Sequence, residues 1–344
     1  MANLTNIAAI IRKFVIPLSV IALIIFLGFL IYFRFFKTQE ITSLLPINKP
    51  VYETLPPQTT QFDTSQLKLP EITPQKLEVY KIISETNLLQ NSDSISQKLG
   101  FNQKPEQLDD AKFGKTLLYS ESQATFLIRQ ETITYLNNAQ FYQVKLLLLQ
   151  KADSANIFDL QNQALNLLSS LGLSVNSLAE PSITFSKKVN NETASTTNIQ
   201  EADFINFQYQ YLLSTIPIII PTSPISITVN KQGDLIYLSY RLLGETSVLS
   251  RYPVIEGEEA LKTLLDGNGS LIQIQEPEET SMASLEKIGP VTLIRAYLAY
   301  YLPTKTPEIL QPVWIFEGET STQDRTTQLT YAVTAITEDL LNQP

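Results

Sequence analysis

Residues 205–213 read INFQYQYLL, the clearest structural signal in the chain. Apolar side chains occupy positions 205, 207, 209, 211 and 213, and Asn206, Gln208 and Gln210 alternate with the first four of them. An alternation with period two is typical of a strand with one face against a core and the other toward water. The stretch therefore predicts a half-buried strand near the middle of the chain.

A hairpin follows this strand. Ile225, Ile227 and Val229 again alternate with polar residues, and the turn NKQGD at 230–234 leads into a second apolar stretch, 235–243. Two alternating runs joined by a short polar turn with a glycine are typical of a β-hairpin. The centre of the chain is therefore predicted to be antiparallel sheet.

Three helices are predicted beside these strands. The clearest has apolar residues at helical spacing from Leu160 to Leu171, with Asp159 as its N-cap and Gly172 just past its end. A short helix is expected over 93–99, ended by Gly100, and a third over 260–265, ended by Gly267.

Strands are predicted after each helix, so that a helix followed by several strands recurs loosely three times. These further strands lie near 114–120, 124–130, 132–136, 270–275, 291–301, 311–317 and 327–336. The order favours an α+β fold built from repeated helix-plus-antiparallel-sheet modules. The regular βαβα order of a doubly wound fold and a glycine-rich phosphate loop are both absent from the sequence.

The N-terminal region predicts a membrane anchor. Residues 14–33, FVIPLSVIALIIFLGFLIYF, form an uncharged run of the length that crosses a hydrocarbon core of about 30 Å. A cleaved signal peptide would need a small-residue cleavage site, and the following RFFKTQE offers none. Basic residues flank both ends, so the expected orientation, with the N-terminus in the cytoplasm, rests on the long acidic part that follows.

The predicted organisation has five parts. Because one of them is a transmembrane helix, the protein is predicted to cross the cell membrane once, with its bulk outside the cytoplasm. The parts are a short cytoplasmic tail (1–13), a transmembrane helix (14–36), a proline-rich linker (37–75), a first α+β module (76–150) and a second α+β region (151–344).

Charge is unevenly distributed. Arg12, Lys13, Arg34 and Lys37 precede Glu40, the first acidic residue, which leaves 21 of the 25 basic residues and all 34 acidic residues for the rest, a net charge of −13. Phosphate binding needs a basic surface, so nucleic acid is not expected as a partner.

The chain contains no cysteine and no histidine. Disulfides, thiolate nucleophiles, imidazole metal sites and Ser-His-Asp chemistry are therefore excluded. Two serine–lysine matches, Ser65/Lys68 and Ser284/Lys287, lack the companion motifs of a catalytic dyad. Carboxylates gather at 109–110, at 258–259 and at 276–279 without the spacing of a calcium loop, and Glu258 and Glu259 are interpreted as charges at a helix start. No catalytic residue, cofactor or metal site is predicted.

Tyrosines are frequent on the predicted strands. Their ordinary interpretation is β-propensity and packing across strands. The functional alternative is an aromatic surface that receives a partner, for which the candidates are Tyr209, Tyr211, Tyr297 and Tyr300. The one tryptophan, Trp314, is expected in the core.

Several short motifs of the C-terminal part occur in a recognisable order. They are YPVI (252–255), EEALKTLL (258–265), the tyrosine-bearing 291–301, PVWI (312–315) and YAVTA (331–335). Over residues 200–337 this resembles the YycH/YycI group of bacterial membrane-anchored regulatory proteins, and more loosely PepSY-like modules. The resemblance implies one N-terminal transmembrane helix, an extracytoplasmic α+β part, no catalytic residues, and regulation of a cell-envelope sensor histidine kinase.

Three functions are compatible with the sequence. The preferred one is a non-enzymatic regulatory protein, anchored in the membrane of the bacterial cell envelope, that acts by contact with a protein partner there. The second is a structural tether or a module that binds cell wall or glycan. The third is an envelope hydrolase that uses carboxylates. The identity of the partner or ligand and the oligomeric state do not follow from the sequence.

Overall fold

The computed structural model describes residues 44–52, 61–83, 87–110, 114–121, 124–137, 154–189, 192–221, 225–275, 289–303, 306–322 and 325–342. The chain divides into two compact units, Met1–Ile47 and Asn48–Pro344. The two main sheets and the site described below belong to the second unit.

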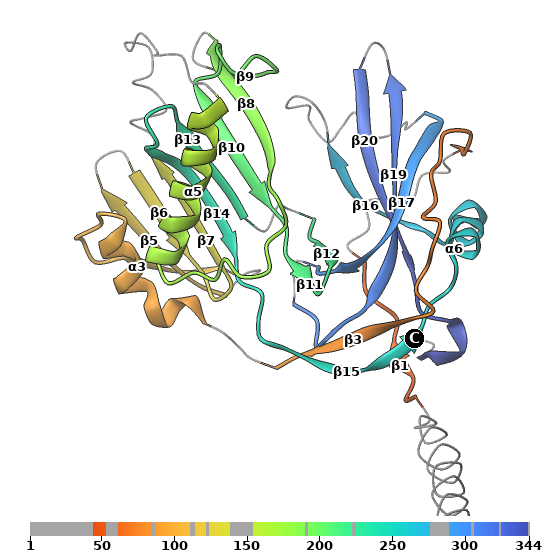
Figure 1. Cartoon of the computed structure of the whole chain (residues 1–344). Helices are drawn as coiled ribbons and strands as arrows, with labels where there is room; N and C mark the ends of the chain where they lie inside the picture. The colour runs from red at the N-terminus through yellow and green to blue at the C-terminus, as the bar shows by residue number, and fades with distance from the viewer. Residues whose placement is uncertain are drawn as a thin grey trace, which may run out of the picture. The chain divides into compact units, whose positions relative to one another are not determined.

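The larger of two main sheets has nine strands, and every neighbouring pair in it is antiparallel (Figure 1). In spatial order the strands are β4 (Glu106–Asp110), β5 (Gly114–Glu121), β6 (Ala124–Ile128), β7 (Thr132–Asn137), β14 (Leu235–Arg241), β13 (Ile225–Asn230), β10 (Phe204–Tyr209), β8 (Ser182–Val189) and β9 (Glu192–Thr196). β10 buries Ile205, Phe207 and Tyr209, as its alternation predicts. It ends at Tyr209, earlier than predicted, because Leu212 and Leu213 join the other sheet.

Helix α5 (Ser154–Ser170) lies across one face of the nine-stranded sheet (Figure 1). Its stripe of Leu160, Ala164, Leu168 and Leu171 is buried in the same core as the side chains of β10 and β13. The predicted N-cap, Asp159, is wrong, because the helix begins five residues earlier. The predicted end is confirmed, because Gly172 has a φ of +77°, the left-handed backbone that a residue past a helix end adopts. The short helix α3 (Ser92–Lys98) contributes Ile95 to the same core, which also contains Tyr119 of β5 and Phe126 of β6.

The second main sheet has seven strands. These are β2 (Phe62–Asp63), β11 (Leu212–Leu213), β12 (Ile216–Ile219), β16 (Ser270–Gln275), β17 (Val291–Tyr301), β19 (Pro312–Thr322) and β20 (Arg325–Thr334). β17 has the bounds that the sequence predicts. α6 (Gly257–Thr263) packs on one face, over Trp314, whose side chain is fully buried and whose Nε1 donates a hydrogen bond to the Ile255 carbonyl. Trp314 is therefore a core residue, as predicted.

Smaller elements complete the described part of this unit. β15 (Thr246–Pro253), β3 (Lys76–Ile82) and β18 (Ile309–Leu310) form a three-stranded sheet. The remaining short strands are β1 (Ile47–Asn48) and β21 (Leu341–Asn342). The acidic residues Glu258 and Glu259 lie in the first turn of α6, as predicted.

A buried cation links β14 to the segment that follows β17. The Arg241 side chain is only 8% exposed, and its Nη2 donates to the Pro303 carbonyl at 2.7 Å. Thr306 Oγ1 donates to Glu131 at 2.6 Å, and that carboxylate lies 3.7 Å from the Arg241 guanidinium. Because a buried charge is tolerated only when it is paired and hydrogen-bonded, Arg241 fixes these segments against each other.

Two β-bulges decide which side chains face each side of the seven-stranded sheet. In β17 the pairing with β19 shifts between Leu293 and Arg295, and in β16 the pairing with β20 shifts between Leu271 and Gln273. A bulge adds one residue to one strand, and a slip of one residue moves the following side chains to the opposite face. Leu293 and Leu271 accordingly pack in the core under α6, whereas Arg295 and Gln273 point to the other face.

The predicted fold class is wrong. Over the residues that it describes, the structure is mostly β-sheet with short helices and does not repeat a helix-plus-sheet module. Strands β4 to β7 and the later strands β8, β9, β10, β13 and β14 pair into one continuous sheet, since β7 pairs with β14. Local periodicity identified most elements, but the partners of each strand are set by contacts far apart in the sequence. The expected boundary between residues 150 and 151 lies outside the described residues and stays a prediction.

The prediction of a membrane anchor also has to be corrected. Among the residues that the structure describes, no helix is both long enough and apolar enough to cross a membrane. The predicted span, 14–36, lies outside those residues. The structure therefore does not support the single-pass anchor or the localisation in the cell membrane that followed from it.

We predict that Gly318→Ala destabilises the protein, because Gly318 lies opposite the bulge of β17. A Cβ at Gly318 would lie 2.7 Å from Val291 Cγ1 and 2.8 Å from the Thr292 carbonyl oxygen, which belongs to the backbone and cannot rotate away. Overpacking of this kind costs about 1–3 kcal/mol, which urea denaturation measures.

Gly289→Ala is the matched control, because its Cβ would meet only Thr320 Oγ1, at 3.4 Å, an ordinary contact. Its free energy of unfolding is expected to change by less than about 0.5 kcal/mol. Equal stability of the two variants would contradict the packing that we describe at the bulge.

Candidate functional site

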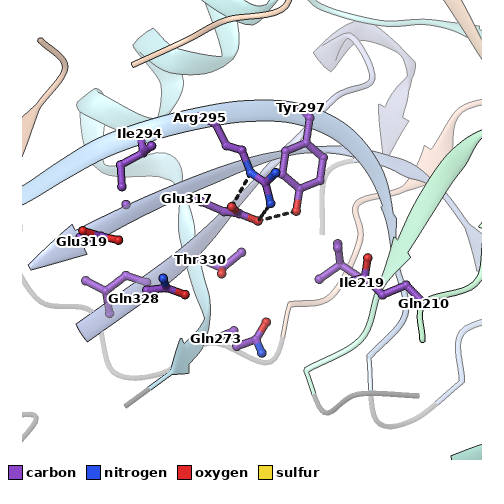
Figure 2. A pocket seen from close by; sticks show the side chains of 12 residues that line it. Gln210, Ile219, Gln273, Ile294, Arg295, Tyr297, Glu317, Glu319, Gln328 and Thr330 are labelled. Carbon is purple, nitrogen blue, oxygen red and sulfur yellow. Dashed lines mark hydrogen bonds and ion pairs between the residues drawn. The ribbon is translucent and has the colours of Figure 1, made fainter. Parts of the chain in front are cut away.

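A polar hollow of about 380 Å³ lies on the face of the seven-stranded sheet opposite α6 (Figure 2). β17, β19, β20 and β16 supply its floor, and Gln210 and Ile219 come from the segment that leaves the nine-stranded sheet. The lining residues are Gln210, Ile219, Gln273, Ile294, Arg295, Tyr297, Glu317, Gly318, Glu319, Gln328, Leu329 and Thr330.

The hollow occupies the polar half of a sheet face whose other half is apolar. Along β19, Val313 and Ile315 are fully buried, whereas Glu317 and Glu319, on the same face, are only half-buried. Cross-strand partners share a face. Thr330 and Gln328 of β20 pair with Glu317 and Glu319 and continue the polar half. The face therefore changes along each strand from buried and apolar to partly exposed and polar.

Arg295 reaches this face because of the bulge in β17. Arg295 is the cross-strand partner of Glu317, and the bulged residue Ile294 lies just before it. Lys68 holds the bulge from the other side: its N–H donates to the Ile294 carbonyl at 3.0 Å, and its carbonyl accepts from the Ala296 N–H at 3.1 Å. These two hydrogen bonds pair the edge of β17 that faces away from β19, beside the bulge.

Glu317 is the centre of a closed group of three side chains (Figure 2). Its Oε2 accepts from Arg295 Nε at 2.6 Å, and its Oε1 accepts from Arg295 Nη2 at 3.0 Å and from the Tyr297 hydroxyl at 2.7 Å. The guanidinium carbon also lies 5.0 Å from the centre of the Tyr297 ring, a cation–π contact. Because the Arg295 side chain is 62% exposed, we assign this pair no more than about 1 kcal/mol.

Electrostatics keep the two donors of this group, Tyr297 and Arg295, protonated. Burial raises the pKa of the Tyr297 phenol, and the Glu317 carboxylate beside it raises this pKa further, so Tyr297 stays protonated and donates. Hydrogen bonds to Glu317 raise the pKa of Arg295 above its ordinary value. The pair is therefore charge-neutral as a unit.

Five other lining side chains have unused hydrogen-bonding capacity. They are Gln210, Gln273, Glu319, Gln328 and Thr330, and none makes a side-chain hydrogen bond or ion pair with another residue that the structure describes. A side-chain amide has two N–H donors and one acceptor oxygen. A hydroxyl both donates and accepts hydrogen bonds, and a carboxylate only accepts them. The hollow thus combines a closed Arg–Glu–Tyr group with an open set of polar groups.

The four tyrosines predicted as partner contacts are not brought together. Tyr297 lines the hollow. Tyr209, Tyr211 and Tyr300 are at most 4% exposed, with the Tyr211 hydroxyl bonded to the Arg241 carbonyl and the Tyr300 hydroxyl to the Glu78 carbonyl. These three side chains pack in the core, and a partner role for any of the four stays a prediction.

Sequence reasoning missed Arg295, Glu317 and the amides beside them. A strict period of two would place Leu293 and Arg295 on one face, and only the bulge separates them. A usable signal does exist in β19, where every second residue reads Val313, Ile315, Glu317, Glu319. A strand face that changes from apolar to charged marks the point at which it leaves the core.

The geometry of the hollow does not favour carboxylate catalysis. Both oxygens of Glu317 are engaged, and Glu319 is its neighbour on the same strand face, so the two do not oppose each other across a cleft. Within the described residues no group of three or more acidic side chains could hold a metal ion. Of the two serine–lysine matches, the one at 284–287 lies outside the described residues.

No protein-family model matches the chain, and no curated protein matches it. Among solved structures, the chain is similar to an uncharacterized protein from Eubacterium rectale ATCC 33656, with 12% sequence identity and a TM-score of 0.46. The alignment covers 80% of this chain and 90% of that one. At this TM-score the likeness carries no argument about function.

We predict that Glu317→Gln lowers the pKa of Tyr297. Removing the carboxylate removes a negative charge that opposes formation of the phenolate, although burial, the larger cause, remains. The Cζ resonance of ¹³C-labelled Tyr297, assigned with Tyr297→Phe, should begin to shift at a lower pH than in the wild type. Glu319→Gln, which removes a carboxylate that does not touch Tyr297, should leave this titration unchanged. Identical titrations of Tyr297 in the wild type and Glu317→Gln would show that the three-residue group does not exist in solution.

Proposed function

We propose that this protein is not an enzyme and acts by contact with a protein partner, which it receives at the polar hollow on the seven-stranded sheet. The observation that supports this most directly is the contrast within the lining. The Arg295–Glu317–Tyr297 group is closed on itself, whereas Gln210, Gln273, Glu319, Gln328 and Thr330 have no side-chain partner in the described part of the chain.

The closed group supports a positioning role rather than a chemical one. A general base or nucleophile needs a free oxygen directed at its substrate, and both oxygens of Glu317 already accept hydrogen bonds from Arg295 and Tyr297. Held in this way, the three side chains form a fixed wall. The open polar groups beside that wall are suited to hydrogen bonds with a bound chain.

The place of the hollow supports binding as well. Its polar groups lie mostly on the paired strands β16, β17, β19 and β20, whose other face packs against α6 in a hydrophobic core. The backbone of paired strands is already ordered before a partner binds, so the entropic cost of association falls on the side chains alone. The resemblance noted above implies a sensor histidine kinase as the class of partner.

Photo-crosslinking from the hollow tests this function. Gln328→p-benzoylphenylalanine, installed in cells that make the protein, is expected to yield a discrete crosslinked polypeptide, identified by mass spectrometry. Gln107→p-benzoylphenylalanine is the matched control, because Gln107 is also an exposed glutamine on a strand, β4, away from the hollow. The crosslink should be absent from the control.

A second variant then tests whether contact at the hollow matters. Gln328→Trp should fill the hollow without touching the core, and should weaken binding of the purified partner at least tenfold in a pull-down titration. The proposal would be wrong if Gln328, Gln273 and Thr330 all fail to crosslink to a polypeptide, or if Gln328→Trp binds the crosslinked partner as the wild type does.

A further inference from the structure

We infer that the segment received by the hollow is an extended peptide with a lysine or arginine side chain, which Glu319 binds, while the glutamine amides hydrogen-bond to the peptide backbone. This inference rests on the proposed function, and it specifies the chemistry of the partner. Glu319 is the feature from which the argument starts.

Glu319 is the unmatched charge of the lining. The hollow contains three ionic side chains, and two of them, Arg295 and Glu317, neutralise each other through two hydrogen bonds. Glu319 is half-buried and forms no ion pair with a residue that the structure describes. A carboxylate that has lost part of its water without gaining a cation favours a cationic guest.

Arg295 does not compete strongly for this role. Its cross-strand partner is Glu317, whereas the cross-strand partner of Glu319 is Thr292. Residues two apart on one strand are separated by about 6.6 Å along its axis. A guest cation at Glu319 therefore lies beyond the Arg295–Glu317 pair, whose own charges cancel to first order.

The remaining open groups match a peptide backbone. Each residue of an extended peptide presents one N–H donor and one carbonyl acceptor. The amides of Gln210, Gln273 and Gln328 and the hydroxyl of Thr330 both donate and accept, and they lie on different sides of the hollow in Figure 2. A volume of about 380 Å³ lies within the usual range for sites that enclose small groups.

Anionic guests are disfavoured by the same charges. The lining residues carry a net charge of −1, from one arginine and two glutamates, and the whole chain has a formal charge of −9 at pH 7. A field of this sign speeds the approach of basic partners and opposes acidic ones. Phosphorylated or nucleic-acid ligands would therefore have to overcome repulsion at long range and again within the hollow.

Peptides that differ in one residue test the inference. The probes are acetyl-Ser-Thr-X-Thr-Ser-amide with X as lysine, arginine, glutamine or glutamate, titrated at low ionic strength against the ¹⁵N-labelled full chain. The side-chain amide resonances of Gln273 and Gln328 report binding. The lysine and arginine peptides are expected to bind at least tenfold more tightly than the glutamine peptide, and the glutamate peptide more weakly still.

Three variants locate the preference. Glu319→Gln should bind the lysine and glutamine peptides equally, and Glu319→Lys should prefer the glutamate peptide. Because the Glu319 side chain makes no hydrogen bond or ion pair with another residue that the structure describes, both variants should keep the wild-type amide spectrum outside the hollow. Glu106→Gln makes the same charge change at an exposed position on β4 and should retain the full preference for lysine.

The outcomes separate this inference from the function on which it rests. Equal binding of the lysine and glutamine peptides by the wild type, or a lysine preference that survives in Glu319→Gln, overturns the inference. So does a shift of the Gln273 and Gln328 resonances by N-acetylglucosamine tetrasaccharide when no peptide shifts them, which would indicate a glycan site. If Gln328 still crosslinks to a polypeptide in either case, protein contact at the hollow stands and only the basic guest is wrong.

Discussion

The bulge at Ile294 is the constraint on which the polar hollow depends. Side chains at every second position of β17 lie on two different faces of the sheet. Val291 and Leu293 face the core under α6, whereas Arg295 and Tyr297 face the hollow. A regular strand cannot place 293 and 295 on different faces. The extra residue makes the change, Lys68 hydrogen-bonds to the opposite edge of β17 at the same point, and Gly318 leaves the space that the bulge requires. The one bulge thus determines both which side chains of β17 pack in the core and which of them line the hollow.

The Arg295–Glu317–Tyr297 group and the open set around Glu319 divide the hollow into a rigid and a receptive part. The first uses its charges internally and adds little to stability, because Arg295 is largely exposed. Its hydrogen bonds and its cation–π contact orient the three side chains relative to one another. The second leaves one negative charge and several amides unpaired by the protein, and these are the groups that would select a partner.

Several parts of this structure follow from the residues alone. The alternation of β10, the bounds of β17, the burial of Trp314 and the glycine after α5 are local properties, and periodicity or backbone sterics are enough to find them. The helix-plus-sheet modules were wrong because β7 pairs with β14, about a hundred residues away, and no local pattern encodes that pairing. The hollow was missed for a related reason: a bulge shifts the face of Arg295, and a sequence shows no sign of a single extra residue.

The buried Arg241 has a consequence for how this protein can change over evolutionary time. Its guanidinium donates a hydrogen bond to the Pro303 carbonyl and forms an ion pair with the Glu131 carboxylate. The Thr306 hydroxyl donates to the same carboxylate. A lysine has neither the planar shape nor the number of donors to replace it, and loss of Glu131 alone would leave a buried cation. Positions 131, 241 and 306 should therefore vary together among homologous sequences, with intermediates that lose one partner at a time being rare.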